Sequence, residues 1–449
     1  MTTTATIPHP PRRVPILGDV LGMDRKRPNQ KTLQQFGRLG PLYRRSFVGG
    51  VHLTFAGSAA LMQELRDEDT WARYAARPYE QLVPIGGQGL FTAPNDSPQW
   101  QRAHEILMPG FARTAMSGYH ETMLRVIDQA EQWIGEEREV TDVAAMMGDA
   151  ALETISLAGF GHPCGVFTSD AERAPFAAAL TRAFAYVQES AIPVLGGLTG
   201  GKRARQHTAD IALMKSTVLE VIAARRRSGI RQPDLLDRML HPESGAALPD
   251  DNIADQVLTF LIAGHETTGN LMAFASYFLA ADPDLAEQVR SEVKTLTSGG
   301  RIDFDDVAKL RFTDAVISES LRLWPTAPGF FRVARRDTTL GGYPIRAGEW
   351  VFALMLAVHR DQEVWGPDAD QFRPHRFLGD TKPVPPGAYR PFGTGPRSCI
   401  GQAFARHEAR LMLASLVRDF ELTTTTSKLD VEENLTLRPS GLAITYRRI

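Results

Sequence analysis

Residues 392–401 read FGTGPRSCIG, and the helical pattern QAFARHEARLMLASLVRDF follows them directly. The stretch holds Cys399, one of two cysteines in the chain, among an aromatic residue, glycines and an arginine. A cysteine at the start of a helix has a lowered thiol pKa, which favours the metal-binding thiolate. Gly395 and Gly401 permit backbone geometry that other residues avoid, so amide N–H groups can turn toward the sulfur. The stretch predicts a cysteine metal ligand, against the alternative of a buried structural cysteine.

The form of this loop, Phe-x-x-Gly-x-Arg-x-Cys-x-Gly, resembles the haem-binding signature of the cytochrome P-450 family. The resemblance implies that the cofactor is haem b, that Cys399 ligates its iron and that O2 is a co-substrate. It also implies that Phe392 covers the haem edge and that Arg397 pairs with a haem propionate.

Residues 253–281 form an almost wholly apolar pattern, which predicts a long helix buried in the fold. Ala263 and Gly264 are small enough for a flat macrocycle and a diatomic ligand to approach the backbone. Glu266 and Thr267 place an acid beside an alcohol, and such a pair can relay protons to bound oxygen. The alternative is a threonine bonded back to the helix backbone and a glutamate in solvent. The segment resembles the family's Ala-Gly-x-Glu/Asp-Thr motif, which favours the relay.

Two further pairs match family motifs that support the cofactor. Glu319 and Arg322 lie three residues apart, so they share one helix face. The resemblance implies that they form a buried structural cluster with Arg376, whereas an ordinary surface pair would stabilise little. Trp100 and His104 match a Trp-x-x-x-Arg/His pair that reaches the propionates. Arg332 matches a further propionate arginine.

The likeness is greatest to the haem domain of bacterial fatty-acid hydroxylases that are fused to a diflavin reductase. It is carried by GLFTAP (89–94), AMSGYH (115–120), FLIAGHETTG (260–269), LRLWPTAPGF (321–330) and ENLTLRP (433–439). It implies that four residues line the substrate cavity, against the alternative of plain core packing: Phe91, Ala263, Ala327 and Leu435.

Two departures from that likeness bear on substrate and electron donor. The arginine and tyrosine that would hold a fatty-acid carboxylate are replaced by Gly50 and Thr54, which leaves room for a neutral or larger substrate. Arg44 or Arg45 is a possible substitute anchor. The sequence ends soon after the last expected strand, so we expect a separate ferredoxin or flavodoxin with its NAD(P)H reductase. Arg406 and Arg410 are candidates for a basic docking surface, or for a solvated helix face.

The bulk properties set limits on class and location. The 449 residues carry a formal net charge of -2, which gives no case for nucleic-acid binding. The N-terminus lacks the apolar stretch of a signal peptide or membrane anchor. Two cysteines fit a reducing cytosol, and a bridge between Cys164 and Cys399 has no support. We therefore expect a cytoplasmic protein that acts on a hydrophobic small molecule.

The expected architecture is mainly α with a smaller β part, with the haem between the 253–281 helix and the cysteine loop. Residues 1–449 are expected to form a single haem domain, with an extended arm over 1–14. Helical spacing marks residues 116–134, 214–227 and 284–296, short strands are expected near 40–56 and 338–345, and an irregular loop over 363–397.

The expected function is a haem-thiolate monooxygenase that inserts one oxygen atom from O2 into a C–H bond or a double bond. A fatty-acid-like molecule or a secondary metabolite is the expected substrate. A haem-thiolate sensor of gas or redox state is one alternative, although it has no need of Glu266 and Thr267. Peroxide-driven hydroxylation is the other.

Overall fold

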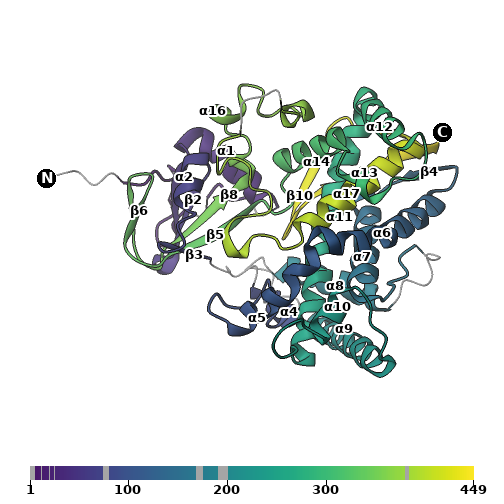
Figure 1. The fold of residues 1–449 in the computed structure, drawn as a ribbon. Helices are drawn as coiled ribbons and strands as arrows, with labels where there is room; N and C mark the ends of the chain where they lie inside the picture. The colour runs from purple at the N-terminus through teal and green to yellow at the C-terminus, as the bar shows by residue number, and fades with distance from the viewer. Residues whose placement is uncertain are drawn as a thin grey trace. The chain divides into compact units, whose positions relative to one another are not determined.

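The structure is a computed structural model that describes residues 6–11, 13–19, 21–24, 26–73, 80–167, 175–190, 201–379 and 384–449. Helices predominate and the strands form small sheets, so the expected mainly α fold with a smaller β part is confirmed. The described residues fall into two compact units, the first within 1–76, 318–399 and 431–438, the second within 77–317, 400–430 and 439–449 (Figure 1). Residues 1–5 and 12 of the expected arm lie outside the description.

The first unit is built on a five-stranded sheet of order β1-β2-β8-β5-β3. Its strands β2 and β8 pair in parallel, and the other neighbours pair antiparallel. Gly49 and Gly50 form the predicted break between β1 and β2, and both have positive φ, 78° and 72°. The strands are β1 (Leu42–Ser46), β2 (His52–Ala56), β3 (Trp71–Arg73), β5 (Gly329–Ala334) and β8 (Trp350–Leu354), and the expected 338–345 strands are the hairpin β6 (Thr338–Leu340) and β7 (Tyr343–Ile345).

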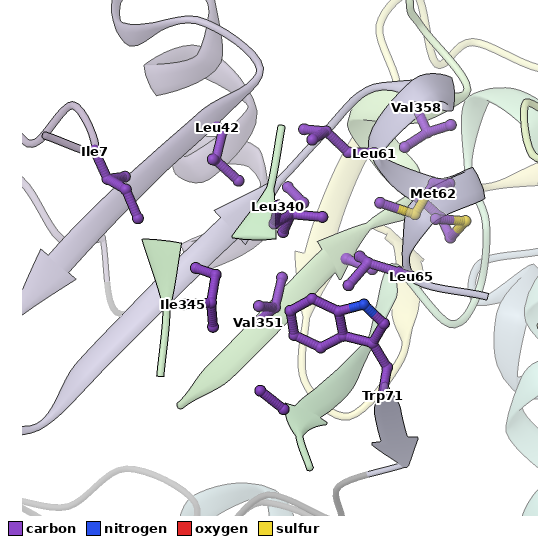
Figure 2. Packing of buried hydrophobic residues seen from close by; sticks show 14 residues of the cluster. Ile7, Leu42, Leu61, Met62, Leu65, Trp71, Leu340, Ile345, Val351 and Val358 are labelled. Atoms are coloured by element: carbon purple, nitrogen blue, oxygen red, sulfur yellow. The ribbon is translucent and has the colours of Figure 1, made fainter. Parts of the chain in front are cut away.

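One face of this sheet is covered by a hydrophobic cluster (Figure 2). Leu61 and Met62 come from α2 (Ala59–Glu64), Trp71 from β3, Leu340 from β6 and Val351 from β8. Each is at most 5% exposed, and burying a side chain of this size stabilises by about 1.5–3 kcal/mol. The cluster therefore holds the β6–β7 hairpin and α2 against the sheet. The other helices of this unit are α1 (Pro28–Leu39), α15 (Met355–Val358) and α16 (Gln362–Trp365).

The second unit is helical and centres on α11 (Asp250–Ala281), which starts three residues before the predicted 253–281 helix. It packs against α7 (Val143–Phe160), α9 (Gly201–Ser228) and α17 (Gln402–Asp419). A Cβ on Gly269 of α11 would lie 2.5 Å from the Gly148 Cα of α7, so paired glycines let these two helices approach closely. The predicted helices at 116–134, 214–227 and 284–296 lie within α6 (Arg113–Ile134), α9 and α12 (Pro283–Thr297).

The remaining elements complete this framework. A three-stranded sheet has the order β4-β12-β9, with β4 (Glu137–Val140), β12 (Ile444–Arg448) and β9 (Phe420–Thr423). Strands β10 (Asp430–Glu433) and β11 (Leu437–Ser440) pair with each other. The shorter helices are α4 (Val83–Gly86), α5 (Pro98–Leu107), α8 (Pro175–Ser190), α10 (Leu235–Leu240), α13 (Phe304–Val307) and α14 (Arg311–Leu323).

Two segments had distinct expectations. Over 363–397 the described residues carry the end of α16 and 3-10 turns at Pro374–Phe377 and Gly395–Arg397, so the irregular loop is confirmed outside 380–383, which lie beyond the description. In the described part, α7 is long and apolar enough to span a membrane, but 83% of it is buried inside the protein. A core helix has the same composition, so α7 is read as part of the core.

Candidate haem site

Neither Cys164 nor Cys399 is in a disulfide within the described residues, and the two differ in exposure. Cys399 is exposed, whereas Cys164 is 2% exposed. The Cys399 backbone N–H donates to the Phe392 carbonyl at 2.9 Å, and the Ser398 N–H donates to the Gly395 carbonyl at 3.0 Å. These bonds fold residues 392–399 back on themselves. The loop therefore presents Cys399, and the alternative of a buried structural cysteine does not hold.

Glycines make this loop possible, although not all of the predicted ones. Gly393 and Gly395 have φ of 77° and 72°, which other residues adopt at a cost. A Cβ on Gly395 would also lie 2.6 Å from Glu68 Oε1. The prediction that Gly401 needs special geometry is wrong, because its φ is -82°. Gly401 precedes the first residue of α17, where ordinary backbone serves.

Two arginines give the cysteine loop an affinity for anions. Arg332 on β5 is 4% exposed and pairs with Glu68 at 3.1 Å, but its Nε has no hydrogen-bond partner. Burial and the neighbouring Arg73 guanidinium lower the pKa of half-buried Arg397 to about 10. Arg397 thus lies beside a second positive charge, where an anion would be favoured.

A haem fits this set of residues. The exposed thiol provides a single soft ligand for iron, as haem-thiolate centres require. The partnerless Nε of Arg332 is a buried donor that a carboxylate would satisfy. Glu68, which contacts Arg332 and limits the space at Gly395, was missed from the sequence because a lone surface-type glutamate carries no motif.

The predicted Glu319–Arg322–Arg376 cluster is present and buried. Arg322 and Glu319 are both fully buried and form two bonds, at 2.6 Å and 2.7 Å. Arg376 Nε donates to Glu319 Oε1 at 2.9 Å. Arg322 also donates to the carbonyls of His359 and Ala369. The surface-pair alternative is therefore wrong, because the side chains of Glu319 and Arg322 are fully buried.

His359 belongs to the same support, and the sequence offered no signal for it. The residue is fully buried, and its Nε2 accepts the Arg390 backbone N–H at 3.0 Å. Burial, together with the Arg322 charge, lowers the pKa of His359 to about 3. The neutral ring is thus available as an acceptor, and it holds the chain two residues before the cysteine loop begins.

The side chains of α11 are less buried at the predicted oxygen motif than on either side of it. Residues 256–262 and 268–276 are buried, whereas Ala263 is exposed and residues 264–267 are half-buried. The Thr267 hydroxyl donates to the Ala263 carbonyl at 2.6 Å, which is the backbone bond named above as the alternative. A hydroxyl that donates once still has two lone pairs to accept with. To donate a proton elsewhere, the hydroxyl would have to rotate away from the Ala263 carbonyl, so the relay stays a prediction.

Trp100 and His104 lie on one face of α5, four residues apart. Their rings stack with centroids 4.8 Å apart, and Trp100 Nε1 donates to the Leu90 carbonyl at 3.2 Å. Both residues are half-buried. The two rings are therefore in contact, and their predicted contact with propionates stays a prediction.

The sequence profile of the cytochrome P-450 family matches residues 8–446. The chain belongs to the cytochrome P-450 family. It is 36% identical to the bifunctional cytochrome P-450/NADPH–P-450 reductase 2 of Bacillus subtilis over 456 residues, all of this chain and 43% of that protein. The corresponding bifunctional protein of Bacillus cereus is 37% identical over 98% of the chain and 42% of its own length. A self-sufficient cytochrome P-450 monooxygenase of Aspergillus terreus is 34% identical over 98% of the chain and 43% of its own length.

The chain thus spans less than half the length of the curated relatives that it matches. Their names bear out the predicted likeness to reductase-fused cytochrome P-450 proteins. Those names also place an NADPH–P-450 reductase within the Bacillus relatives themselves.

The four predicted cavity residues of this P-450 are not core residues. Phe91 is 37% exposed, Ala263 and Ala327 are exposed, and Leu435 is half-buried. The Leu437 N–H donates to the Thr326 carbonyl at 2.9 Å, which ties the turn that carries Leu435 to the segment that carries Ala327. The core-packing alternative is therefore wrong for Phe91, Ala263 and Ala327.

The positions that replace a carboxylate anchor have structural roles instead. Gly50 forms the β1–β2 turn, and buried Thr54 accepts a bond from Arg44 at 3.1 Å. Arg44 also pairs with Glu349 at 2.7 Å. Arg45 is 3% exposed and donates to the Asp19 carbonyl. Neither arginine is therefore a substitute anchor, because both guanidinium groups are used within the protein.

Arg406 and Arg410 form a compact ion cluster on α17. Both pair with Asp314 at 2.6 Å, and their side chains are 16% and 23% exposed. Asp314 offsets part of their charge, so a fully solvated helix face does not describe them, and the docking surface stays a prediction. Spacing along one helix could not reveal an acid on α14.

Proposed function

We propose that the chain is a haem-thiolate monooxygenase that inserts one oxygen atom from O2 into a C–H bond or a double bond of a hydrophobic small molecule. The observation that carries this proposal is the exposed Cys399, held in a glycine-closed loop in a chain of the cytochrome P-450 family. Bound haem b supplies the iron centre that takes up O2 and electrons.

In this proposal Cys399 would ligate the iron and would supply the thiolate donor of a haem-thiolate centre. Arg332, Arg397, Trp100 and His104 hold the propionates, and Phe392 lies against the haem edge. The partnerless Arg332 Nε supports the assignment of Arg332, and the others rest on the resemblance to the family. The buried Glu319 cluster acts only through the chain that it supports.

We assign proton delivery to Glu266 and Thr267. Glu266 lies in the half-buried stretch of α11, so its carboxyl can exchange protons with water. In this proposal the Thr267 hydroxyl rotates away from the Ala263 carbonyl, takes up a proton from the side of Glu266 and gives up its own proton. Gas sensing has no use for this pair, and the family's peroxide-driven members are the ones that lack it.

The proposed substrate is apolar and need not carry a carboxylate. Phe91, Ala263, Ala327 and Leu435 offer apolar surface, while Gly50 and Thr54 offer no cation and Arg44 and Arg45 are already paired. A fatty-acid carboxylate therefore has no cation to pair with at these positions. Neutral terpene-like or macrolide-like molecules do not need such a cation. Titrating all three classes into the ferric protein and recording the low- to high-spin shift decides between them.

The electron donor is a reductase-linked protein in our proposal, and we infer a separate ferredoxin or flavodoxin with its NAD(P)H reductase. Turnover of the purified 449-residue chain with each donor tests this inference. Product formation from O2 that requires a donor supports the monooxygenase. Haem uptake without any oxygenated product would favour a sensor, and product from peroxide alone would favour a peroxide-driven enzyme. We propose a cytoplasmic location, supported by the burial of α7 and the free thiols.

A further inference from the structure

An exposed apolar turn lies near the start of the described chain. Ile16, Leu17, Leu21 and Met23 are 89%, 49%, 51% and 50% exposed. These four residues fall within eight positions, and they include the most exposed large hydrophobic side chain of the described residues. Single exposed apolar residues need no explanation, but a contiguous group marks an interaction surface.

The backbone of this turn is strained in a way that displays Ile16. Val14 and Gly18 exchange two backbone bonds, and the Leu17 N–H donates to the Pro15 carbonyl at 2.8 Å. Ile16 is therefore the central residue of a γ-turn with φ of 69°, a rare and strained form. A branched side chain in this region is a true outlier. The Ile16 side chain is therefore exposed to solvent on a strained backbone.

The turn is mounted rigidly on the β1–β2 hairpin. The Asp19 backbone N–H donates to the Ser46 carbonyl, and the buried Asp19 carboxylate accepts bonds from the Ser46 N–H at 2.8 Å and from Arg13 at 3.0 Å. Arg45 donates to the Asp19 carbonyl at 2.9 Å. A Cβ on Gly18 would lie 2.1 Å from the Ser46 oxygen, so the contact is tight. The apolar tip is thus presented by a fixed support.

Basic residues surround this tip in the sequence. Residues 1–40 contain seven Lys and Arg, against two Asp and no Glu, although the whole chain has a net charge of -2. Asp19 is buried and pairs with Arg13 at 3.0 Å, whereas Asp24 is exposed and accepts the backbone N–H groups of Lys26 and Arg27. Lys26 is exposed, and so is Arg13. The net charge of the chain conceals this local excess.

We propose that this surface, Ile16, Leu17, Leu21, Met23 and Lys26, binds reversibly to the face of an anionic lipid bilayer. Apolar side chains enter the interface between headgroups and acyl chains, and basic side chains are attracted to anionic headgroups. A protein partner of opposite charge is less suited, because a four-residue tip is small for a stable protein interface. The contact is peripheral and needs no membrane-spanning anchor.

The test is co-sedimentation of the haem-loaded full chain with vesicles of phosphatidylcholine, and with vesicles of equal parts phosphatidylcholine and phosphatidylglycerol. We expect binding to the mixed vesicles only, and a loss of binding as salt is raised. The double variant Leu17→Ser/Leu21→Ser should bind about tenfold more weakly. Lys26→Glu should weaken binding by about fivefold or more.

Matched controls lie in the second unit. Ile230 is 61% exposed, and Lys428 is also exposed, so Ile230→Ser and Lys428→Glu remove similar groups elsewhere. Both controls should bind like the parent, and all variants should unfold at the parent's temperature. Equal binding to neutral vesicles, or binding that Leu17→Ser/Leu21→Ser leaves unchanged, would overturn the proposal. So would self-association in the absence of vesicles that this double variant abolishes, because the occupant would then be a second copy of the chain.

Discussion

Cys164 and Cys399 are chemically identical side chains in two contrasting regions. Cys164 follows α7 and is 2% exposed, and burial raises the pKa of its thiol to about 12. Its N–H donates to the buried Glu153 carboxylate at 3.0 Å. Cys399 is exposed in a loop closed by two positive-φ glycines. A thiol that stays protonated is neither a ligand nor a nucleophile, so the surroundings decide which cysteine can bind iron.

The same contrast separates two glutamates. Glu408 of α17 is 3% exposed, and burial raises the pKa of its carboxyl to about 8. Glu266 is half-buried within α11. The first is kept neutral by the core, whereas the second can reach water. Residue type names a possible chemistry, and the packing around the residue permits or forbids it.

The largest effect should come from exchanging the two cysteines for alanine separately. Cys399→Ala should reduce donor-dependent product formation to background, because the proposed iron ligand is removed. Cys164→Ala should keep turnover within about twofold and lower the free energy of unfolding by about 1 kcal/mol, because it removes only a buried packing group. Product assays and urea unfolding of both variants check this. Equal losses of turnover would erase the distinction between the two regions.

Charge burial can be compared in the same way. Arg322→Ala should lower the free energy of unfolding by about 3–5 kcal/mol, because it leaves the fully buried Glu319 short of its main partner. Arg301→Ala is the matched exposed change, since Arg301 and Asp128 pair at 3.1 Å with both side chains about half exposed. That variant should lose less than about 1 kcal/mol. Similar losses would show that burial does not set the value of these pairs.

Glu408 gives the comparison a pH dependence. Its pKa rises from 4.5 in the unfolded chain to about 8 in the folded protein. Its contribution to stability is therefore complete below the unfolded pKa, and is lost as pH rises through the folded pKa. Glu408→Gln keeps the shape without the titration, so it should flatten this slope and stabilise by about 2 kcal/mol at neutral pH. Urea unfolding across a pH series measures this, and an unchanged slope would refute it.

The smallest expected effect concerns the two neighbouring threonines of α11, Thr267 and Thr268. Thr267→Ala removes the hydroxyl of the proposed relay and should lower the yield of product per electron by roughly fivefold, while reductant is still consumed. Thr268→Val removes the neighbouring hydroxyl, which is buried, and should leave that yield unchanged. Paired measurements of reductant use and product give the ratio. A Thr267→Ala variant that stays fully coupled would contradict the relay.

Much of this architecture was predictable because its signals are local. The α11 helix follows from its apolar run, the β1–β2 break from two glycines, and the Glu319–Arg322 pair from a three-residue spacing. The cysteine loop was predictable for the same reason, since its groups lie within ten residues of one another.

The misses arise where the deciding contact comes from a distant part of the sequence. The spacing of Arg406 and Arg410 suggests a basic face, but Asp314 of α14 pairs with both residues in the structure. Arg44 and Arg45 are candidate carboxylate anchors in the sequence. In the structure Arg44 pairs with Glu349, and Arg45 donates to the Asp19 carbonyl. Gly401 was assigned a backbone role that Gly393 has instead, because composition does not reveal φ.

The central claim is that the sulfur of Cys399 binds haem iron, and absorption under carbon monoxide tests it most directly. The reduced parent protein should give the strongly red-shifted band that an anionic sulfur donor produces, and Cys164→Ala should give the same band. Cys399→Ala should lose it. A parent protein without that band, or a Cys399→Ala variant that retains it, would contradict the account.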